Sequence, residues 1–184
     1  MKGLSHLQLC LTQNYAKLRE ILAALYGWVE DQKRVKILRG FKKYPLNIYG
    51  PVTGEIKGIT DQKHIFHGLK TCEEVLTILK NTRVLLNSVG VFSGGSHERI
   101  WFSIASGCMP YTDPSSFVEE TYINEESILT IDYKDIPNSV AKIIHYSETP
   151  DLLQPIVNKA QTIYIENHTW VKRIENTFME MNII

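Results

Sequence analysis

Residues 94–99 form the segment with the clearest potential for chemistry, because their sequence Gly-Gly-Ser-His-Glu-Arg directly precedes an apolar helical pattern. Ser96 is a favoured helix N-cap residue, which would place His97, Glu98 and Arg99 in the first turn. The positive end of a helix dipole favours Glu98 and disfavours Arg99 by about 0.3–1 kcal/mol. A phosphate bound at this turn would reverse that preference, because it accepts backbone N–H groups and pairs with an arginine.

Two interpretations of this segment are compatible with its residues alone. In the first, Gly94 and Gly95 let the backbone approach an anion closely, because neither carries a side chain. In the second, the helix begins with an ordinary solvated turn, and Arg99 pairs with a neighbouring acid. The rest of the helix is predicted to be structural, with Gly107 as its left-handed end and an inward face made of Ile100, Trp101, Ile104 and Ala105.

The composition of the 184-residue chain narrows its possible partners. Lysine plus arginine and aspartate plus glutamate number 20 each, so the formal net charge is zero. This balance gives no broad attraction to nucleic acid or to an anionic membrane, and we expect no nucleic-acid partner. The three cysteines, Cys10, Cys72 and Cys108, are too widely spaced for a disulfide framework or a zinc site. Without an apolar run of transmembrane length or a signal peptide, the sequence predicts a cytoplasmic protein.

Several common catalytic motifs are missing from the sequence. It contains no Walker A loop, no G-x-G-x-x-G dinucleotide fingerprint and no G-x-S-x-G nucleophile elbow. There is also no Asp-x-Asp pair to hold a metal–diphosphate complex. His64 and His67 straddle a predicted strand end, which favours a structural pair over a metal site. We therefore expect no metal and no cofactor.

The N-terminal segment, residues 1–29, is predicted to be a separate helical element. Its apolar residues step by four and three positions, which places one set on a single helix face: Leu11, Tyr15, Leu18, Leu22 and Leu25. A short coiled-coil dimer would show the same spacing, but little more than two heptads are present, so packing on the chain's own domain is favoured. Tyr26 and Gly27 are expected to end this helix, and a second helix is expected over Asp31–Lys43.

Residues 30–184 alternate between short apolar runs and helical patterns. The strand candidates are Leu46–Tyr49, His64–Phe66, Val84–Leu86, Met109–Thr112 and Ile128–Ile131. Helix starts are expected at Thr71, Ser115, Asp135, Asp151 and Thr169. The alternation predicts an α/β fold, a Rossmann-like three-layer α/β/α domain with a mostly parallel sheet. Ligands bind such a sheet at the carboxyl ends of its strands, which here are Gly50, residues 67–68, residues 87–88 and residues 112–113.

Residues 84–113 resemble the nucleotide-sugar-binding half of GT-B glycosyltransferases, in particular the group 1, spore-maturation-type enzymes and, more distantly, the exostosin-type enzymes. In those families a strand ending in Leu-Asn is followed by a loop, a helix that starts with His-Glu-Arg or a lone Arg, and then Ala-x-Gly. The matching residues here are Leu86-Asn87, His97-Glu98-Arg99 and Ala105-Ser106-Gly107. Weaker likenesses on both sides extend the resemblance to about residues 30–182.

The resemblance implies a domain that binds a nucleoside-diphosphate sugar, with the diphosphate near the start of the helix. Arg99 would neutralise charge that develops on the diphosphate, and His97 and Glu98 would act beside it on the sugar or ribose side. The position of the family's ribose-binding glutamate is taken here by Phe102, and Glu119 or Glu120 of the next helix is the candidate to replace it. The other substrate-binding residues are expected to be Gly50, Asn87, Gly94, Gly95, Ser96 and Asp113.

A GT-B enzyme has two Rossmann-like domains, and this chain has room for one. The resemblance therefore implies that an N-terminal acceptor domain is missing, or that a partner supplies it; the acceptor itself is not indicated. Two alternatives remain, namely a non-catalytic nucleotide-sugar binding module and an α/β interaction domain assembled through the helix Leu11–Leu25. Stabilisation by nucleoside diphosphates would favour a nucleotide-binding domain over the interaction domain.

Overall fold

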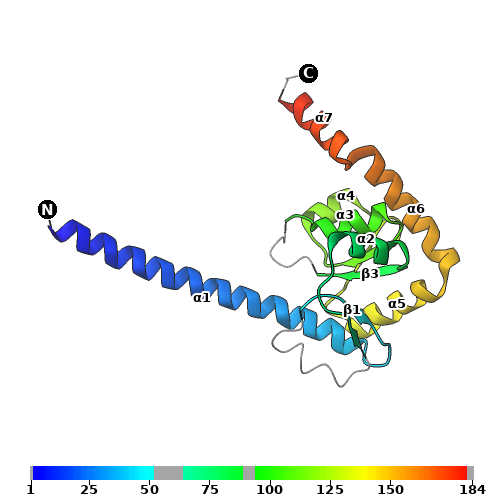
Figure 1. The fold of residues 1–184 in the computed structure, drawn as a ribbon, viewed down its shortest axis with the longest axis horizontal. Helices are drawn as coiled ribbons and strands as arrows, with labels where there is room; N and C mark the ends of the chain where they lie inside the picture. The colour runs from blue at the N-terminus through cyan, green and yellow to red at the C-terminus, as the bar shows by residue number, and fades with distance from the viewer. Residues whose placement is uncertain (1, 52–63, 89–93, 182–184) are drawn as a thin grey trace.

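The computed structural model describes residues 2–51, 64–88 and 94–181, with side chains from residue 14 onward (Figure 1). The helices are α1 (Lys2–Gly40), α2 (Cys72–Lys80), α3 (Glu98–Ala105), α4 (Ser116–Thr121), α5 (Ile136–Glu148), α6 (Pro150–Asn167) and α7 (Trp170–Glu180). The strands are β1 (Asn47–Ile48), β2 (Ile65–Phe66), β3 (Val84–Asn87), β4 (Met109–Thr112) and β5 (Leu129–Thr130). This order of elements confirms the predicted Rossmann-like α/β fold.

All of these strands pair in parallel, and they form two small sheets. β1 pairs with β2, with Asn47 opposite Ile65. The second sheet has the order β3-β4-β5, with Asn87 opposite Thr112 and Thr112 opposite Thr130. All four residues of β4 are buried, as expected for a central parallel strand covered on both faces. Because the strands are parallel, the carboxyl ends of β3, β4 and β5 lie at one edge of their sheet.

Helix α3 packs against β4 and α6, and its inward side is part of the hydrophobic core. Ile100 and Ile104 are completely buried, as predicted, and Trp101 is half-buried. The prediction for Ala105 was wrong, because that residue is exposed and Ser103 is buried in its place. The Ser103 hydroxyl donates to the Ile100 carbonyl at 2.9 Å, so this polar side chain is satisfied within the helix itself.

The two helices predicted in the first 43 residues are one continuous helix, α1, of 39 residues. The expected break at Gly27 does not occur. A glycine inside a helix costs only about 1 kcal/mol relative to alanine, which is too little to end a long helix. The helix instead ends after Gly40, where it crosses α5. A Cβ at Gly40 would lie 2.6 Å from Ile136 and 2.9 Å from Val140, so only glycine permits this close approach.

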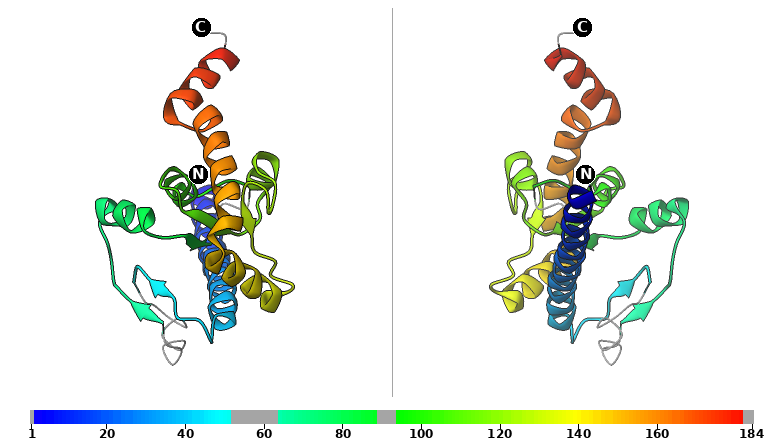
Figure 2. Two further views of the ribbon diagram at one scale, coloured as in Figure 1. Left: turned by 90° about the vertical axis from the view of Figure 1, so that its right-hand side faces the viewer. Right: turned by 90° about the vertical axis from the view of Figure 1, so that its left-hand side faces the viewer.

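Most of α1 extends away from the domain in Figure 1, and the two views of Figure 2 look nearly along this helix. Residues 14–29 are exposed, whereas Ile37 and Phe41 belong to the core. The predicted packing of the apolar N-terminal face on the chain's own domain was therefore wrong for Tyr15, Leu18, Leu22 and Leu25, which are 52–73% exposed. The side chain of Leu11 lies outside the described part of the chain.

The sequence located most helix starts correctly. Thr71 makes a reciprocal capping box with Glu74 at the start of α2, and Ser115, Asp135 and Thr169 each accept a capping hydrogen bond from a backbone N–H. The start of α3 differs from the prediction, because its N-cap residue is His97 rather than Ser96. The predicted end of α3 is confirmed, since Gly107 has a φ of +78° and follows the C-cap.

Candidate functional site

A cavity of about 370 Å³ opens where β1 and β3 end, beside α1 and the start of α3. We name it the arginine cleft, because two arginines from distant parts of the chain line it. This is the location where parallel α/β sheets bind ligands. Its walls come from α1, β1, β3, α3 and the segment after β5: Asp31, Arg34, Ile37, Leu38, Ile48–Pro51, Leu86–Ser88, Arg99, Ile131 and Tyr133.

Arg99 lies in the first turn of α3 and is held at two points. Its Nη2 donates to the backbone carbonyl of Ser88 at 3.0 Å, directly after β3. Its Nε donates to Nδ1 of His97 at 3.3 Å. These contacts fix the guanidinium at the cleft while leaving other N–H groups for a ligand, since an arginine carries five. The predicted position of Arg99 at an anion site is therefore compatible with the structure.

Arg34, on α1, lines the same cleft and was not identified from the sequence. Partial burial of the guanidinium and then the positive charge of Arg34 lower the pKa of Arg99, whereas Glu98 and Asp113 act in the opposite direction. Arg34 pairs with Asp31 at 3.3 Å, but both side chains are more than 40% exposed, so this pair is weak. Two like charges on one cleft repel each other, and a bound anion would remove that repulsion.

Asn87, the last residue of β3, carries a buried side-chain oxygen beside the cleft. Its Nδ2 donates to the Thr112 hydroxyl at 2.9 Å, which links the ends of β3 and β4. Its Oδ1 has no hydrogen-bond partner in the described part of the chain, although the residue is only 1% exposed. An unpaired buried acceptor is costly, typically about 1–3 kcal/mol, and a ligand hydroxyl or N–H group would satisfy it.

Asp113 was predicted to bind substrate, and it is not among the residues that line the cleft. Its carboxylate accepts hydrogen bonds from the Tyr133 hydroxyl and, at 3.3 Å, from the Ser88 hydroxyl. Burial and this contact raise the pKa of Tyr133 well above its ordinary value, so the phenol remains a hydrogen-bond donor. The carboxylate thus connects Ser88, after β3, with Tyr133, after β5, and both of these residues line the cleft.

The remaining predicted site residues divide into two groups. Gly50 lines the cleft, at the end of β1. His97 and Glu98 are at the start of α3 but are not lining residues, and His97 contacts Arg99 instead. The other predicted residues also lie outside the lining of the cleft. The carbonyl of Gly94 accepts from the Ser116 hydroxyl, and that of Gly95 accepts from the Ser115 hydroxyl. Ser96 precedes α3 and accepts from Trp101, and Glu119 lies in α4.

Burial and the charge of Arg99, acting in the same direction, lower the pKa of His97. The neutral imidazole is consistent with its role in the structure, because Nδ1 accepts from both the backbone N–H and the Nε of Arg99 at 3.3 Å. His97 therefore caps the helix and orients the arginine. Its predicted role beside the sugar stays a prediction.

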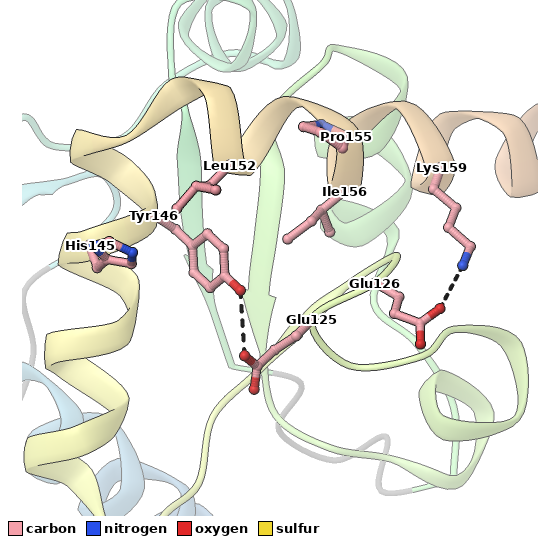
Figure 3. A pocket seen from close by; sticks show the side chains of 8 residues that line it. All are labelled: Glu125, Glu126, His145, Tyr146, Leu152, Pro155, Ile156 and Lys159. Atoms are coloured by element: carbon pink, nitrogen blue, oxygen red, sulfur yellow. Dashed lines mark hydrogen bonds and ion pairs between the residues drawn. The ribbon is translucent and has the colours of Figure 1, made fainter.

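A second pocket, of about 400 Å³, lies against α5 and α6 (Figure 3). It is lined by Glu125 and Glu126, which precede β5, whereas the arginine cleft uses residues that follow β5. Both carboxylates are already paired, Glu125 with Lys142 at 2.6 Å and Glu126 with Lys159 at 2.7 Å. The Tyr146 hydroxyl also donates to Glu125 at 3.4 Å. With its charges compensated, this pocket offers less to a charged ligand than the arginine cleft does.

Two further properties bear on the type of site. Within residues 2–51, 64–88 and 94–181, no group of three or more His, Cys, Asp or Glu side chains is arranged to hold a metal ion. In the same ranges, no helix is both long and apolar enough to cross a membrane.

Fold and cleft together define a Rossmann-like α/β domain with an arginine-lined cavity at the carboxyl ends of its strands. The chain belongs to the glycosyl transferase-like family, whose sequence model matches residues 28–178. Its fold is similar to that of the C-terminal domain of a glycosyl transferase group 1 family protein (LpcC) from Francisella tularensis. That likeness has a TM-score of 0.56 and 14% sequence identity over 76% of this chain and 80% of the other. No curated protein is significantly similar in sequence. The resemblance to a GT-B C-terminal domain is thus confirmed.

Proposed function

We propose that the chain is the donor-binding domain of a glycosyltransferase and holds a nucleoside-diphosphate sugar in the arginine cleft. The observation that carries the proposal is the convergence of Arg99 and Arg34 on one cavity at the carboxyl ends of parallel strands. Membership of the glycosyl transferase-like family supports the same type of ligand.

The two arginines would act on the diphosphate. When the bond between sugar and diphosphate breaks, negative charge grows on the leaving phosphate oxygens. A fixed cation stabilises that charge more in the transition state than in the bound substrate, which accelerates transfer. Arg99 is suited to this role because Ser88 and His97 hold it in place. Arg34, paired weakly with Asp31, would contribute mainly to binding.

Other groups of the cleft would bind the uncharged parts of the donor. The Oδ1 of Asn87, which has no partner among the described residues, would accept a hydrogen bond from a hydroxyl of the sugar or ribose. Tyr49 lies at the edge of the cleft and is 41% exposed, with its ring stacked on His67 at a centroid distance of 4.6 Å. This aromatic face would receive the nucleobase.

The acceptor would bind outside this cleft, on a second domain or a partner protein. The similar structure from Francisella tularensis is itself described as a C-terminal domain, which supports a two-domain arrangement. On this view the isolated chain binds the donor without completing transfer to an acceptor.

A ligand panel tests the proposal directly. Thermal unfolding of the full chain would be followed with UDP, GDP, CDP, ADP, the matching monophosphates and inorganic diphosphate. At 100 times the dissociation constant a ligand adds about 2.7 kcal/mol, which for this chain length raises Tm by roughly 5–10 °C. We expect one nucleoside diphosphate to stabilise the domain more than its monophosphate and more than inorganic diphosphate. If no nucleotide stabilises it, the proposed function is wrong.

A further inference from the structure

The exposed part of α1 carries a continuous apolar surface, which we name the α1 stripe. Its members are 45–73% exposed: Tyr15, Leu18, Ile21, Leu22, Leu25, Trp28 and Val29. Their spacing repeats every seven residues, with Leu18 and Leu25 at one heptad position, Ile21 and Trp28 at a second, and Tyr15, Leu22 and Val29 at a third. Three apolar positions in every heptad are the pattern of a helix that packs against another helix.

The chain's own domain does not cover the α1 stripe, and helix geometry gives the reason. The buried residues of α1 are Glu30, Val35, Ile37 and Phe41. At 3.6 residues per turn, all four lie on the half of the helix opposite the stripe, and their mean direction is roughly 140° from the centre of the stripe. The stripe therefore faces away from the buried side of α1, and it lies on the part of this helix that extends out from the domain in Figure 1.

The size of the stripe is appropriate for a partner protein. Tyr15 and Trp28, at 73% and 58% exposure, together present roughly 200–300 Å². Five half-exposed aliphatic side chains add to this, which brings the stripe towards the about 800 Å² per partner of a standard interface. Isolated apolar patches beyond a few hundred Å² are uncommon on monomeric proteins.

We propose that the α1 stripe pairs with the same stripe of a second copy of this chain, in antiparallel orientation. In an antiparallel helix pair, the first heptad position of one helix meets the second position of the other. The register that places Leu18 against Trp28 of the second copy also places Ile21 against Leu25 of the second copy. The two-fold axis then passes between the two copies of Leu22, and Tyr15 meets Val29 of the second copy.

The charges beside the stripe support this orientation. In the antiparallel register, Lys17 lies next to Asp31 of the second copy, and the symmetric pair repeats at the other end. Ala24 lies between the two Lys17–Asp31 pairs and faces Ala24 of the second copy, so no like charges meet on this side of the helix pair. In a parallel pair, Lys17 would instead lie beside Leu22 of the second copy, with no opposite charge. Polar amides lie at both ends of the apolar segment, because Asn14 falls opposite Gln32 of the second copy. Within one chain these two residues are about 27 Å apart along the helix.

The test is the mass of the full chain in solution, measured by sedimentation equilibrium with a reductant present. We expect a dimer of twice 21.1 kDa across the micromolar range. Leu22→Glu places two carboxylates at the two-fold axis and should weaken the dimer by at least about 100-fold. Ala23→Glu adds the same charge on the opposite side of the exposed helix and should leave the dimer intact. Both variants should keep the wild-type far-ultraviolet circular dichroism.

Charge exchange tests the orientation. Lys17→Asp faces Asp31 of the second copy and should weaken the dimer by about tenfold, because two pairs become repulsive. Addition of Asp31→Lys to that variant should restore the wild-type dissociation constant. A chain that is monomeric across the micromolar range, or a dimer insensitive to Leu22→Glu, overturns the proposal. Failure of the double variant to restore the dimer overturns the antiparallel register.

Discussion

The Nη2 atom of Arg99 donates to the backbone oxygen of Ser88 at 3.0 Å, which ties the first turn of α3 to the end of β3. With Nε bonded to His97, three of the five N–H groups of this guanidinium have no partner in the described part of the chain. The arginine is therefore oriented before any ligand arrives. An oriented cation loses little side-chain entropy on binding, so its contribution to affinity should be large.

The first prediction concerns that arginine. Arg99→Ala should weaken binding of a nucleoside diphosphate by about 1.5–3 kcal/mol, or roughly 10–150-fold, because it removes charge-assisted hydrogen bonds. Isothermal titration calorimetry gives the affinity. Arg83→Ala is the matched control, since Arg83 precedes β3 at the end opposite the cleft and bonds to Ser147. Unchanged affinity in an Arg99→Ala variant that folds poorly would show that the arginine is structural.

The second prediction concerns Arg34. Arg34→Ala should weaken diphosphate binding by about 0.5–1.5 kcal/mol, less than Arg99→Ala, because Arg34 is shared with Asp31. The loss should shrink as salt is added, since the exposed charge is screened. Arg39→Ala on the same helix is the control, because Arg39 is exposed and does not line the cleft. Equal losses of diphosphate affinity in Arg34→Ala and Arg39→Ala would exclude a specific role for Arg34.

The third prediction separates the sugar nucleotide from its diphosphate. Asn87→Ala should lower affinity for a nucleoside-diphosphate sugar by about 0.5–1.5 kcal/mol, because the ligand hydroxyl loses its acceptor. Affinity for inorganic diphosphate should stay within twofold. The ratio of the two affinities is informative even if loss of the Thr112 contact lowers stability. A parallel fall in both affinities would contradict a hydroxyl contact.

The fourth prediction concerns pH and His168, which packs against Trp101 with ring centroids 4.8 Å apart. Burial and then the charge of Arg173 lower the pKa of His168 from its ordinary 6.5. The unfolded chain therefore takes up this proton first, so stability is full above about pH 6.5 and falls as the pH drops below it. His168→Phe should flatten the loss between pH 7 and 5 in urea unfolding. His97→Asn is the comparison variant, because the pKa of His97 is also lowered and this substitution leaves His168 in place. An unchanged pH slope in His168→Phe would contradict the assignment.

The fifth prediction compares two glycines of α1. Gly40→Ala should lower the free energy of unfolding by about 1–3 kcal/mol, because its methyl group would overlap Ile136 and Val140. Gly27→Ala has no atom within 4 Å of its new Cβ and should raise helix stability by about 0.5–1 kcal/mol. Urea midpoints and helical circular dichroism measure both. Equal responses would mean that α1 does not cross α5 closely at Gly40.

Local signals in the sequence were sufficient for most elements of the fold. Helix starts depend on short-range hydrogen bonds, so Thr71, Ser115 and Thr169 could be recognised from their own neighbourhoods. The continuity of α1 could not, because the propensity cost of Gly27 is small beside the length of the helix. The burial of α1 depends on its angle to the domain, which no local pattern specifies.

The residues of the arginine cleft were likewise predicted where the signal was local and missed where it depended on the path of the chain. Asn87, Gly50 and Arg99 were predicted from strand ends and a helix start, and all three line the cleft. Arg34 was missed because it lies 65 positions before Arg99 in the sequence and reaches the cleft only through the path of α1. Tyr133 was missed for a similar reason, because its contact with Asp113 requires the pairing of β4 with β5.

Trp101 gives the loop ahead of α3 an optical reporter. Its indole Nε1 donates to the Ser96 hydroxyl at 3.0 Å, while its ring contacts His168 and lies under the guanidinium of Arg173. The other two tryptophans, Trp28 and Trp170, are 58% and 79% exposed. We therefore expect Trp101 to emit at shorter wavelength than the exposed Trp170. A ligand that moves the loop, or a displacement of α7, would change this emission without any added label.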